Sequence, residues 1–333
     1  MKDLCNYSLL AHNTFGIDVR CSRFLEYETT EEAQQVAQVL ASSDTPYIII
    51  GGGSNLLLTR DFEGIVVHSV LKGCSFQGTQ MVCGSGVVFD EAVAMSLDHG
   101  CYGMENLSLI PGDVGASAVQ NIGAYGVEVK DVIVEVEAVE IATGRLCTFT
   151  NADCQYGYRD SRFKHEWKNR YLITHVTYQL SADFQPHLDY GNIRAELERC
   201  GIAEPTAQQL RQVIIDIRRA KLPDPEEIGN AGSFFMNPIV SREKYEALAA
   251  EYPGMPHYTV DAMHEKIPAG WMIDQCGWKG RSLGRAGVHD RQALVLVNRG
   301  GATGQEVVDL CNAIRRDVRE TFGIDIHPEV NII

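Results

Sequence analysis

The chain has 333 residues, which is too long for one ordinary hydrophobic core and predicts two or three domains. Its net charge of −15 at pH 7 argues against nucleic acid or an anionic membrane surface as a partner, so an anionic ligand would need a locally basic pocket. Ten scattered cysteines without a C-x-x-C pair, the lack of a signal-peptide core and the lack of a long apolar run predict a cytoplasmic protein with reduced thiols and no metal site.

A strand followed by three glycines is the first distinctive feature. The stretch "PYIIIGGGSNLLLT" at residues 46–59 carries these glycines at 51–53. A Rossmann unit needs a helix directly after its glycines and an acidic residue about 20 positions later. Here only 11 residues separate Gly53 from Ile65, where a second strand-like run begins, and residues 65–80 contain no Asp or Glu. The pattern argues against a Rossmann fold and leaves another anion cradle, or only a tight turn.

Hydrophobic periodicity and turn residues predict the regular elements that follow. The last ten residues alternate apolar and polar side chains around Pro328, which lacks an N–H and favours an edge strand or a bulge. The proline-rich "KLPDPEE" is the best candidate for a domain boundary. The expected elements are helices at 89–100, 206–220, 241–252 and 304–322, a hairpin at 131–150, and strands at 171–180 and 324–333.

A second glycine-rich segment lies at residues 107–126, and we expect both glycine segments to adjoin strands and not helices. Missing side chains let backbone N–H groups approach a flat or anionic ligand closely. For any single glycine, a turn is the simpler interpretation. The density of small residues here, together with Gln120, Asn121 and Tyr125, favours a cofactor cradle.

Nine motifs stand in order along the whole chain and together resemble the UDP-N-acetylenolpyruvoylglucosamine reductase (UDP-N-acetylmuramate dehydrogenase) family. One of them, "LDYGN", resembles the form of the family in which a tyrosine loop closes over the substrate. The motifs are "HNTFGID", "IIIGGGSNLL", "LIPGDVGASAVQNIGAYG", "GYRDSRFK", "LDYGN", "KLPDP", "GNAGSFFMNP", "AGWMIDQCGWKG" and "HPEVNII".

The resemblance implies an α+β protein with a two-lobed FAD-binding fold of the vanillyl-alcohol-oxidase type and a C-terminal α/β substrate-binding domain. The implied domains are FAD-binding lobe 1 at 1–70 with 323–333, FAD-binding lobe 2 at 71–220, and the substrate-binding domain at 221–322. The final strand would return to the N-terminal lobe. Ala118 and Met236 depart from the proline and lysine expected in many relatives.

The implied activity is the NADPH-dependent, FAD-mediated reduction of UDP-N-acetylglucosamine enolpyruvate to UDP-N-acetylmuramate. This flavoprotein reaction belongs to peptidoglycan precursor synthesis, and so to cell wall biogenesis, cell shape and cell division. FAD is expected to bind non-covalently, because no residue can be assigned as an attachment point. We expect a cytoplasmic monomer that acts on a small UDP-sugar, with no nucleic acid, membrane or metal partner.

Hydride addition to the enolpyruvyl β-carbon drives charge into the substrate carboxylate, so the site needs stabilising groups and an acid for the α-carbon. The resemblance assigns these roles to Arg159, Ser233 and Glu329. Without it, Arg159 would be read as a surface partner of Asp160, Ser233 as a turn hydroxyl and Glu329 as a solvated strand carboxylate. To stabilise an enolate, Glu329 must donate a hydrogen bond.

The resemblance also assigns the binding residues. Lys221 could otherwise satisfy the carbonyls at a helix C-terminus. The implied cofactor residues are Gly51, Gly52, Gly53, Ser54, Asn55, Leu56, Pro111, Gly112, Gly115, Ala116, Ser117, Ile122, Gly123, Tyr125 and Arg218. The implied substrate residues are Tyr190, Lys221, Asn237, Tyr258, Lys266, Lys279 and Gln292.

Two alternative functions stay open from the sequence. One is an FAD oxidase of the same fold that acts on an alcohol or lactone with oxygen as acceptor, and it has no need of the Ser233 motif. The other is a nucleotide-sugar-binding protein without turnover, which would need no flavin and would be colourless. The sequence does not fix the preference for NADPH over NADH.

Overall fold

A computed structural model describes the whole chain, residues 1–333, which forms two compact units. The chain passes from one unit to the other within the glycine run, since Gly52 belongs to unit 1 and Gly53 to unit 2. None of the helices combines the length and the hydropathy that a membrane span requires. Unit 1 comprises Met1–Ser8, Arg20–Gly52 and Phe62–Ala220, and unit 2 comprises Leu9–Val19, Gly53–Asp61 and Lys221–Ile333.

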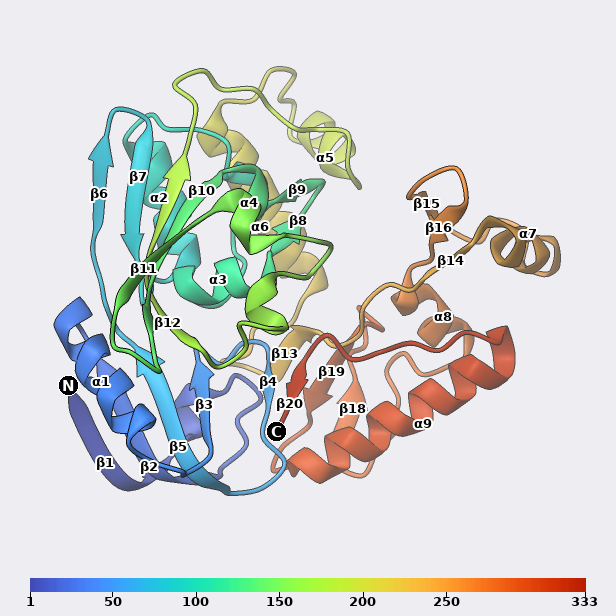
Figure 1. Ribbon diagram of the computed structural model, residues 1–333. Coiled ribbons are helices and arrows are strands. Elements are labelled where there is room, and N and C mark those ends of the chain that lie inside the picture. Colours follow the sequence, from blue (N-terminus) through green and yellow to red (C-terminus); the bar gives the residue numbers. More distant parts are fainter. The chain divides into compact units, whose positions relative to one another are not determined.

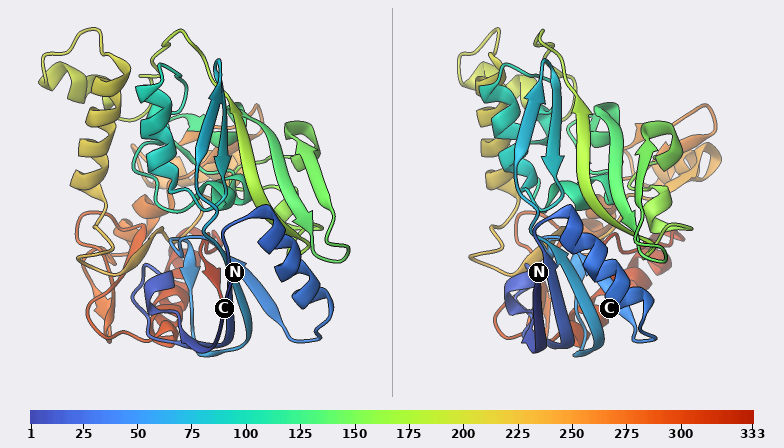
Figure 2. Two further views of the ribbon diagram at one scale, coloured as in Figure 1. Left: turned by 90° about the vertical axis from the view of Figure 1, so that its left-hand side faces the viewer. Right: turned by 60° about the vertical axis from the view of Figure 1, so that its left-hand side comes forward.

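The first sheet of unit 1 contains, in spatial order, β1 (Lys2–Ser8), β2 (Arg20–Tyr27), β5 (Phe62–Ser69) and β3 (Tyr47–Ile50). β1 pairs antiparallel with β2, whereas β5 is parallel to both β2 and β3. Helix α1 (Thr30–Ala41) begins where the Thr29 side chain accepts a hydrogen bond from the Glu32 amide. Its buried face packs on this sheet and also on Val139 and Leu172 of the second sheet, so α1 lies between the two sheets (Figure 2).

The connection between β3 and β5 contains no helix. It consists of residues 51–61, in which the only regular element is β4 (Leu56–Leu57). The lack of a helix after the glycines confirms that this segment is not a Rossmann unit. β3 and β5 are nevertheless parallel. Their connection is made by residues Gly53 to Asp61, which belong to unit 2, before the chain re-enters unit 1 at β5.

The second sheet of unit 1 is antiparallel and contains, in order, β11 (Leu146–Thr150), β10 (Ile133–Glu140), β12 (Tyr171–Gln179), β7 (Gln80–Gly84) and β6 (Cys74–Gln77). α2 (Phe89–Asp98) and α3 (Val114–Gln120) pack their buried side chains against it (Figure 1). α6 (Ala207–Lys221) packs on α5 (Ile193–Arg199) through an apolar cluster that includes Leu197 and Ile214. The expected hairpin, strand and helices in this region are confirmed.

The second glycine segment differs from the sequence-based expectation, because α3 lies within it. Helix α3 has seven residues and ends at Asn121, whose φ of +46° is left-handed. Its first turn is held from outside, since the Gly115 amide donates to the Ser85 carbonyl at 2.9 Å. Short elements complete unit 1: η2 (Glu105–Leu107), β8 (Gly123–Ala124), β9 (Val127–Glu128), η3 (Val129–Asp131), α4 (Asn151–Cys154) and η4 (Arg162–Lys164).

Unit 2 contains a four-stranded sheet of β13 (Asn230–Ser233), β19 (Val295–Asn298), β18 (Ala286–Val288) and β17 (Ser282–Leu283). α9 (Gly304–Phe322) begins at a capping box of Thr303 and Glu306 and ends at Gly323, as predicted. The unit also contains η1 (Leu10–His12), α8 (Ala269–Gln275), α7 (Arg242–Glu251) and a three-stranded sheet of β14 (Ile239–Ser241), β16 (His264–Lys266) and β15 (Tyr258–Thr259).

The C-terminal segment is less regular than the expected strand at 324–333. Only β20 (Asn331–Ile332) is a strand, and it pairs parallel with β4. Ile324 and Ile326 are buried as their alternation predicts. Pro328 forms only an isolated bridge with Phe235, because a proline has no amide to continue a ladder.

Candidate active site

The two glycine segments meet in unit 1. A Cβ atom at Gly51 would lie 2.9 Å from the Cβ atom of Ala116, and one at Gly52 would lie 3.4 Å from the Cα atom of Gly112. A Cβ atom at Gly115 would lie 2.8 Å from that of Ser85. Gly51 and Gly115 therefore lie closer to Ala116 and Ser85 than a residue with a side chain could, and this allows the tight packing of the glycine segments.

The rest of the second segment divides into exposed and buried positions. Pro111 is exposed and Ala116 is half-buried. Ser117 is buried and its hydroxyl donates to the Val114 carbonyl at 2.6 Å, so in this conformation it supports α3 from within. Ile122 packs at the margin of the unit 1 core. Ala118, which replaces an expected proline, is fully buried inside α3, where an amide can complete the helix.

The remaining residues of the glycine run lie in unit 2, and their backbone is crowded. A Cβ atom at Gly53 would lie 2.0 Å from the His12 carbonyl oxygen, and Gly53 has a left-handed φ of +69°. The Thr14 amide donates to the Gly53 carbonyl at 3.2 Å. The carbonyl of Asn55 accepts from the amide of Asn331 at 3.1 Å. The "HNTFG" motif and the C-terminal segment thus hold the turn that contains Ser54.

Arg159 contacts the second glycine segment. Its Nη2 donates to the Gly123 carbonyl at 2.6 Å and its Nη1 to the Asn121 carbonyl at 3.4 Å. An Asp160 carboxylate oxygen lies 2.8 Å from Nε2 of His165, so Asp160 has a side-chain partner other than Arg159. The guanidinium is half-buried, and a Cβ atom at Gly123 would lie 2.9 Å from it. The position fits a site arginine better than a surface ion pair.

Arg218 gives the strongest evidence for a missing polar ligand in unit 1. It lies on α6, and its Nε atom is buried without a hydrogen-bond partner. Burial lowers the pKa of this arginine, against the opposing effects of Tyr125 and Asp90, and the positive charge of Arg159 lowers it further. A buried guanidinium nitrogen without an acceptor is costly, and a ligand oxygen or nitrogen would satisfy it.

Tyr190 lies beside the same segment. A Cβ atom at Gly126 would lie 3.4 Å from the Tyr190 Cβ atom. The side-chain amide of Asn106 donates to the carbonyls of Tyr125 and His187, each at 2.9 Å, and thereby ties the glycine segment to the loop that carries Tyr190. Gly191 has a left-handed φ of +66°, which suits a loop that bends here.

Ser233 and Glu329 are brought together in unit 2. The Glu329 amide donates to the carbonyl of Phe234, the residue after Ser233, at 2.8 Å. The Met236 amide donates to the His327 carbonyl at 3.0 Å and completes this short pairing. The fully buried Phe234 fixes the strand end, while Ser233 is exposed. Two of the three expected catalytic residues therefore lie on neighbouring, paired backbone segments of unit 2.

The expected substrate residues of unit 2 form two groups and two separate lysines. Asn237 and Gln292 lie near the start of α8: the Asn237 Oδ1 accepts from the Ala269 amide at 2.9 Å, and Gln292 Oε1 lies 3.2 Å from where a Gly270 Cβ atom would be.

The second group spans the three-stranded sheet. Lys266 is opposite Tyr258 on one side and Ile239 on the other, and its Nζ lies 5.8 Å from the centre of the Tyr258 ring. Lys279 pairs with Asp274 at 3.2 Å, and Lys221 is the exposed last residue of α6.

Two residues hold this site in ways that the sequence did not predict: Asn121, expected only as part of the cofactor cradle, and Thr14. Asn121 is fully buried, and its side chain donates to the Gly157 carbonyl at 2.6 Å, so it fixes the loop of Arg159. Thr14 accepts from the Asn230 amide at 3.0 Å through its carbonyl and joins two motifs that are distant in sequence. The only sign of these roles in the sequence is that the two residues lie inside "QNIGAYG" and "HNTFG". Composition alone does not show which residue of a motif holds the site.

Comparisons with known proteins agree with this arrangement. Residues 22–150 match the family described as FAD binding domain, and residues 224–333 match UDP-N-acetylenolpyruvoylglucosamine reductase, C-terminal domain. A UDP-N-acetylenolpyruvoylglucosamine reductase of Bacteroides fragilis (strain YCH46) is 55% identical over 333 residues, which cover 98% of this chain and 99% of that protein. The protein of the same name from Flavobacterium johnsoniae is 43% identical over 339 residues and all of both chains.

The fold comparison extends this to a crystal structure. UDP-N-acetylenolpyruvylglucosamine reductase from Thermus caldophilus aligns with a TM-score of 0.68 over 99% of this chain and 98% of that chain, at 22% identity. At that identity, the likeness shows the fold alone. The two-lobed FAD-binding fold with a C-terminal substrate domain is therefore confirmed.

Proposed function

The chain belongs to the family of UDP-N-acetylenolpyruvoylglucosamine reductases, and from this premise we propose which of its residues perform the reaction. The protein is an FAD-dependent oxidoreductase that uses NADPH to reduce UDP-N-acetylglucosamine enolpyruvate to UDP-N-acetylmuramate, a step of peptidoglycan precursor synthesis. Family membership favours this reductase over the oxidase and over a binding protein without turnover.

The residues of unit 1 fit FAD. When bound, FAD supplies the hydride chemistry that links NADPH to the enolpyruvyl β-carbon. Gly51 and Gly52 present backbone to the diphosphate, and the buried Nε of Arg218 is left for a polar edge of the cofactor. The proposed set is completed by Gly53, Ser54, Asn55, Leu56, Pro111, Gly112, Gly115, Ala116, Ser117, Ile122, Gly123 and Tyr125.

Ser233 and Glu329 are proposed to act on the substrate from unit 2. The single observation that carries this is the 2.8 Å bond from the Glu329 amide to the Phe234 carbonyl, which places Glu329 and Ser233 on two paired backbone segments. Ser233 Oγ donates the proton that the α-carbon receives, and protonated Glu329 donates a hydrogen bond to the developing enolate.

Arg159 is proposed to bind the substrate carboxylate. A guanidinium holds a carboxylate through two parallel hydrogen bonds and keeps its charge at any working pH. Its contacts with the Gly123 and Asn121 carbonyls orient the guanidinium at the cofactor segment.

The UDP part of the substrate needs cations and hydrogen-bond donors on an acidic chain. We assign Lys266 and Tyr258, which lie across one sheet, to this part, because their exposed row combines a charge with an aromatic face. The same binding role is proposed for Tyr190, Lys221, Asn237, Lys279 and Gln292.

We also propose the finer form of the protein. Tyr190 belongs to a loop that closes over the substrate, which makes this chain the tyrosine-loop form of the family. The support is the hydrogen bond that the side chain of Asn106 donates to that loop.

The proposed domains are FAD-binding lobe 1 at 1–70 with 323–333, lobe 2 at 71–220, and the substrate domain at 221–322. The pairing of β20 with β4 supports the return of the C-terminus to lobe 1. The protein is proposed to be a cytoplasmic monomer.

The function can be tested in two half-reactions. The purified protein should show a flavin spectrum, bleach when NADPH is added under anaerobic conditions, and regain its colour when the enolpyruvyl substrate follows. Reoxidation by oxygen together with turnover of an alcohol, without a response to the enolpyruvyl substrate, would overturn the proposal.

A further inference from the structure

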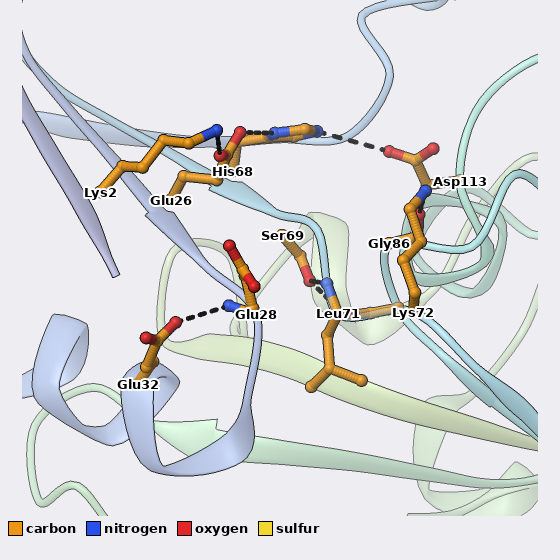
Figure 3. A network of polar contacts seen from close by, with 11 residues as sticks. Lys2, Glu26, Glu28, Glu32, His68, Ser69, Leu71, Lys72, Gly86 and Asp113 are labelled. Atoms are coloured by element: carbon orange, nitrogen blue, oxygen red, sulfur yellow. Dashed lines mark hydrogen bonds and ion pairs between the residues drawn. The ribbon is translucent and has the colours of Figure 1, made fainter.

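Figure 3 shows a row of four charged or ionisable side chains in unit 1, from Lys2 to Asp113. Lys2 of β1 forms an ion pair with Glu26 of β2. Nδ1 of His68, on β5, lies 3.2 Å from the other Glu26 oxygen, and its Nε2 lies 3.7 Å from Oδ2 of Asp113. We call Lys2, Glu26, His68 and Asp113 the His68 array.

The array is largely withdrawn from solvent. The side chains of Glu26, His68 and Asp113 expose 6%, 12% and 11% of their surface. Burial raises the pKa of Glu26, but the hydrogen bonds from Lys2 and His68 outweigh it and hold the pKa below its usual value. The array therefore contains a buried carboxylate that stays charged because two neighbours stabilise it.

Asp113 connects the array to the glycine turn. It stands at the N-cap of α3, yet its side chain makes no capping hydrogen bond to that helix, which is the usual use of such an aspartate. Its carboxylate oxygens lie 3.4 Å from where a Gly51 Cβ atom would be and 3.5 Å from where a Gly52 Cβ atom would be. The carboxylate thus lies directly under the turn.

We propose that His68 is a positioning residue of the cofactor site: it holds the Asp113 carboxylate under the Gly51–Gly52 turn and keeps the turn in the conformation that binds the FAD diphosphate. This rests on the proposed assignment of that turn to FAD. A carboxylate beside a turn that binds a diphosphate would repel the phosphates more as it moves toward them, so its position affects binding. His68 provides the attachment through Nε2, and Glu26 with Lys2 fixes the ring through Nδ1.

Two substitutions separate this role from a structural one. When histidine is replaced by glutamine, the side-chain amide nitrogen takes the place of Nε2. When it is replaced by asparagine, the side-chain amide nitrogen takes the place of Nδ1. His68→Gln therefore keeps a donor for Asp113, while His68→Asn keeps a donor for Glu26 only. We expect His68→Asn to raise the Kd of the apoprotein for FAD by on the order of tenfold, the effect of losing the 3.7 Å contact of a largely buried pair, and His68→Gln to remain within about threefold of wild type.

FAD affinity is measured by the quenching of flavin fluorescence on titration with apoprotein, and the Tm of each apoprotein is measured alongside. If His68 only satisfies the buried Glu26, the order reverses: His68→Asn binds FAD normally and His68→Gln loses Tm. That result would overturn the inference. In an Asp113→Asn background, His68→Asn should change the Kd by less than about threefold, because its partner is gone. An undiminished effect there would also contradict the role.

Two controls complete the test. His175→Asn removes a histidine whose Nδ1 lies 3.4 Å from Glu137 in the same unit, away from the turn, and should leave FAD affinity unchanged. Gly52→Val places a side chain in the turn and should abolish FAD binding. If Gly52→Val binds FAD normally, the proposed cofactor site itself is overturned. If Gly52→Val does not bind FAD but His68→Asn binds it normally, only the role of His68 is overturned.

Discussion

The amide of Glu329 is hydrogen-bonded at 2.8 Å to the carbonyl of Phe234, although 94 residues lie between them in the chain. The bond brings the polar face of the C-terminal segment to the end of β13, where Ser233 stands. The two residues proposed as proton donor and enolate stabiliser thus lie on segments that are joined by backbone hydrogen bonds. Each can be tested separately.

Glu329→Gln should slow the reduction of the enolpyruvyl substrate and leave the flavin reducible by NADPH. A neutral amide still donates a hydrogen bond, so the loss measures how much depends on the carboxylic acid; removal of such a stabiliser costs about 10²–10³ in rate. Glu320→Gln, on the exposed side of α9, is the matched control and should have wild-type rates. Wild-type turnover in Glu329→Gln would return this residue to a surface role.

Tyr190→Ala should weaken substrate binding while the rate of flavin reduction by NADPH changes little. The reason is that Tyr190 lies on a loop that contacts the cofactor segment at Gly126 and through the side-chain amide of Asn106. Tyr190→Phe separates the contribution of the ring from that of the hydroxyl, because it keeps the ring that closes over the substrate and removes only the hydroxyl. Substrate Kd and stopped-flow reduction are the measurements, and equal damage to both steps would indicate a folding role.

Gly53→Ala should reduce FAD binding strongly. A Cβ atom there would lie 2.0 Å from the His12 carbonyl oxygen, so the turn must deform. Gly78→Ala is a close control, because Gly78 also has a left-handed φ, of +61°, but nothing lies within 4 Å of the added atom. That variant should lose only about 1 kcal/mol of stability and bind FAD normally. Equal FAD content in the two purified variants would show that the crowding at Gly53 does not matter.

Asp90 provides a stability test with a defined pH dependence. Burial raises its pKa, but the bidentate bond from Arg211 and the Leu109 amide outweigh burial and hold the pKa below its usual value. A depressed folded-state pKa stabilises the protein above the unfolded value of about 3.9, and this contribution is lost as the pH falls through the folded pKa.

We expect Asp90→Asn to lower the free energy of unfolding of unit 1 by about 2 kcal/mol at pH 7, and by progressively less below about pH 4. Glu196→Gln breaks the exposed ion pair with Arg199 and should change the free energy of unfolding by less than about 1 kcal/mol. Urea unfolding at several pH values checks this. A difference between Asp90→Asn and wild type that persists unchanged below pH 3 would contradict the ion-pair explanation.

The sequence predicts the elements whose own residues determine them. α9 is found at its expected bounds because Thr303 caps its start and Gly323 its end. By the same reasoning, α1 was detectable from Thr29 and Glu32, which form its N-terminal cap. Elements that depend on distant residues were not predictable, and α3 is the example. Its glycine and alanine residues show no period, and Ser85, in the turn after β7, holds its first turn.

The same distinction applies to the site. Arg159, Ser233 and Glu329 follow from ordered motifs, but nothing in their local sequence distinguishes them from surface residues. The C-terminal strand was expected over ten residues from alternation alone, whereas Pro328 reduces it to β20 and an isolated bridge. His68 lies outside the nine motifs and Asp113 within one of them, and only the fold brings the two residues together.

Ser233→Ala tests the central claim most directly, because the two half-reactions use different groups. Reduction of the flavin by NADPH needs no proton at the substrate α-carbon, whereas reoxidation by the enolpyruvyl substrate does. Stopped-flow absorbance under anaerobic conditions should show bleaching with NADPH at nearly the wild-type rate, followed by reoxidation that is slower by roughly 10²–10⁴-fold, the scale of a lost general acid. Reoxidation at the wild-type rate would show that Ser233 is not the proton donor and would contradict the account.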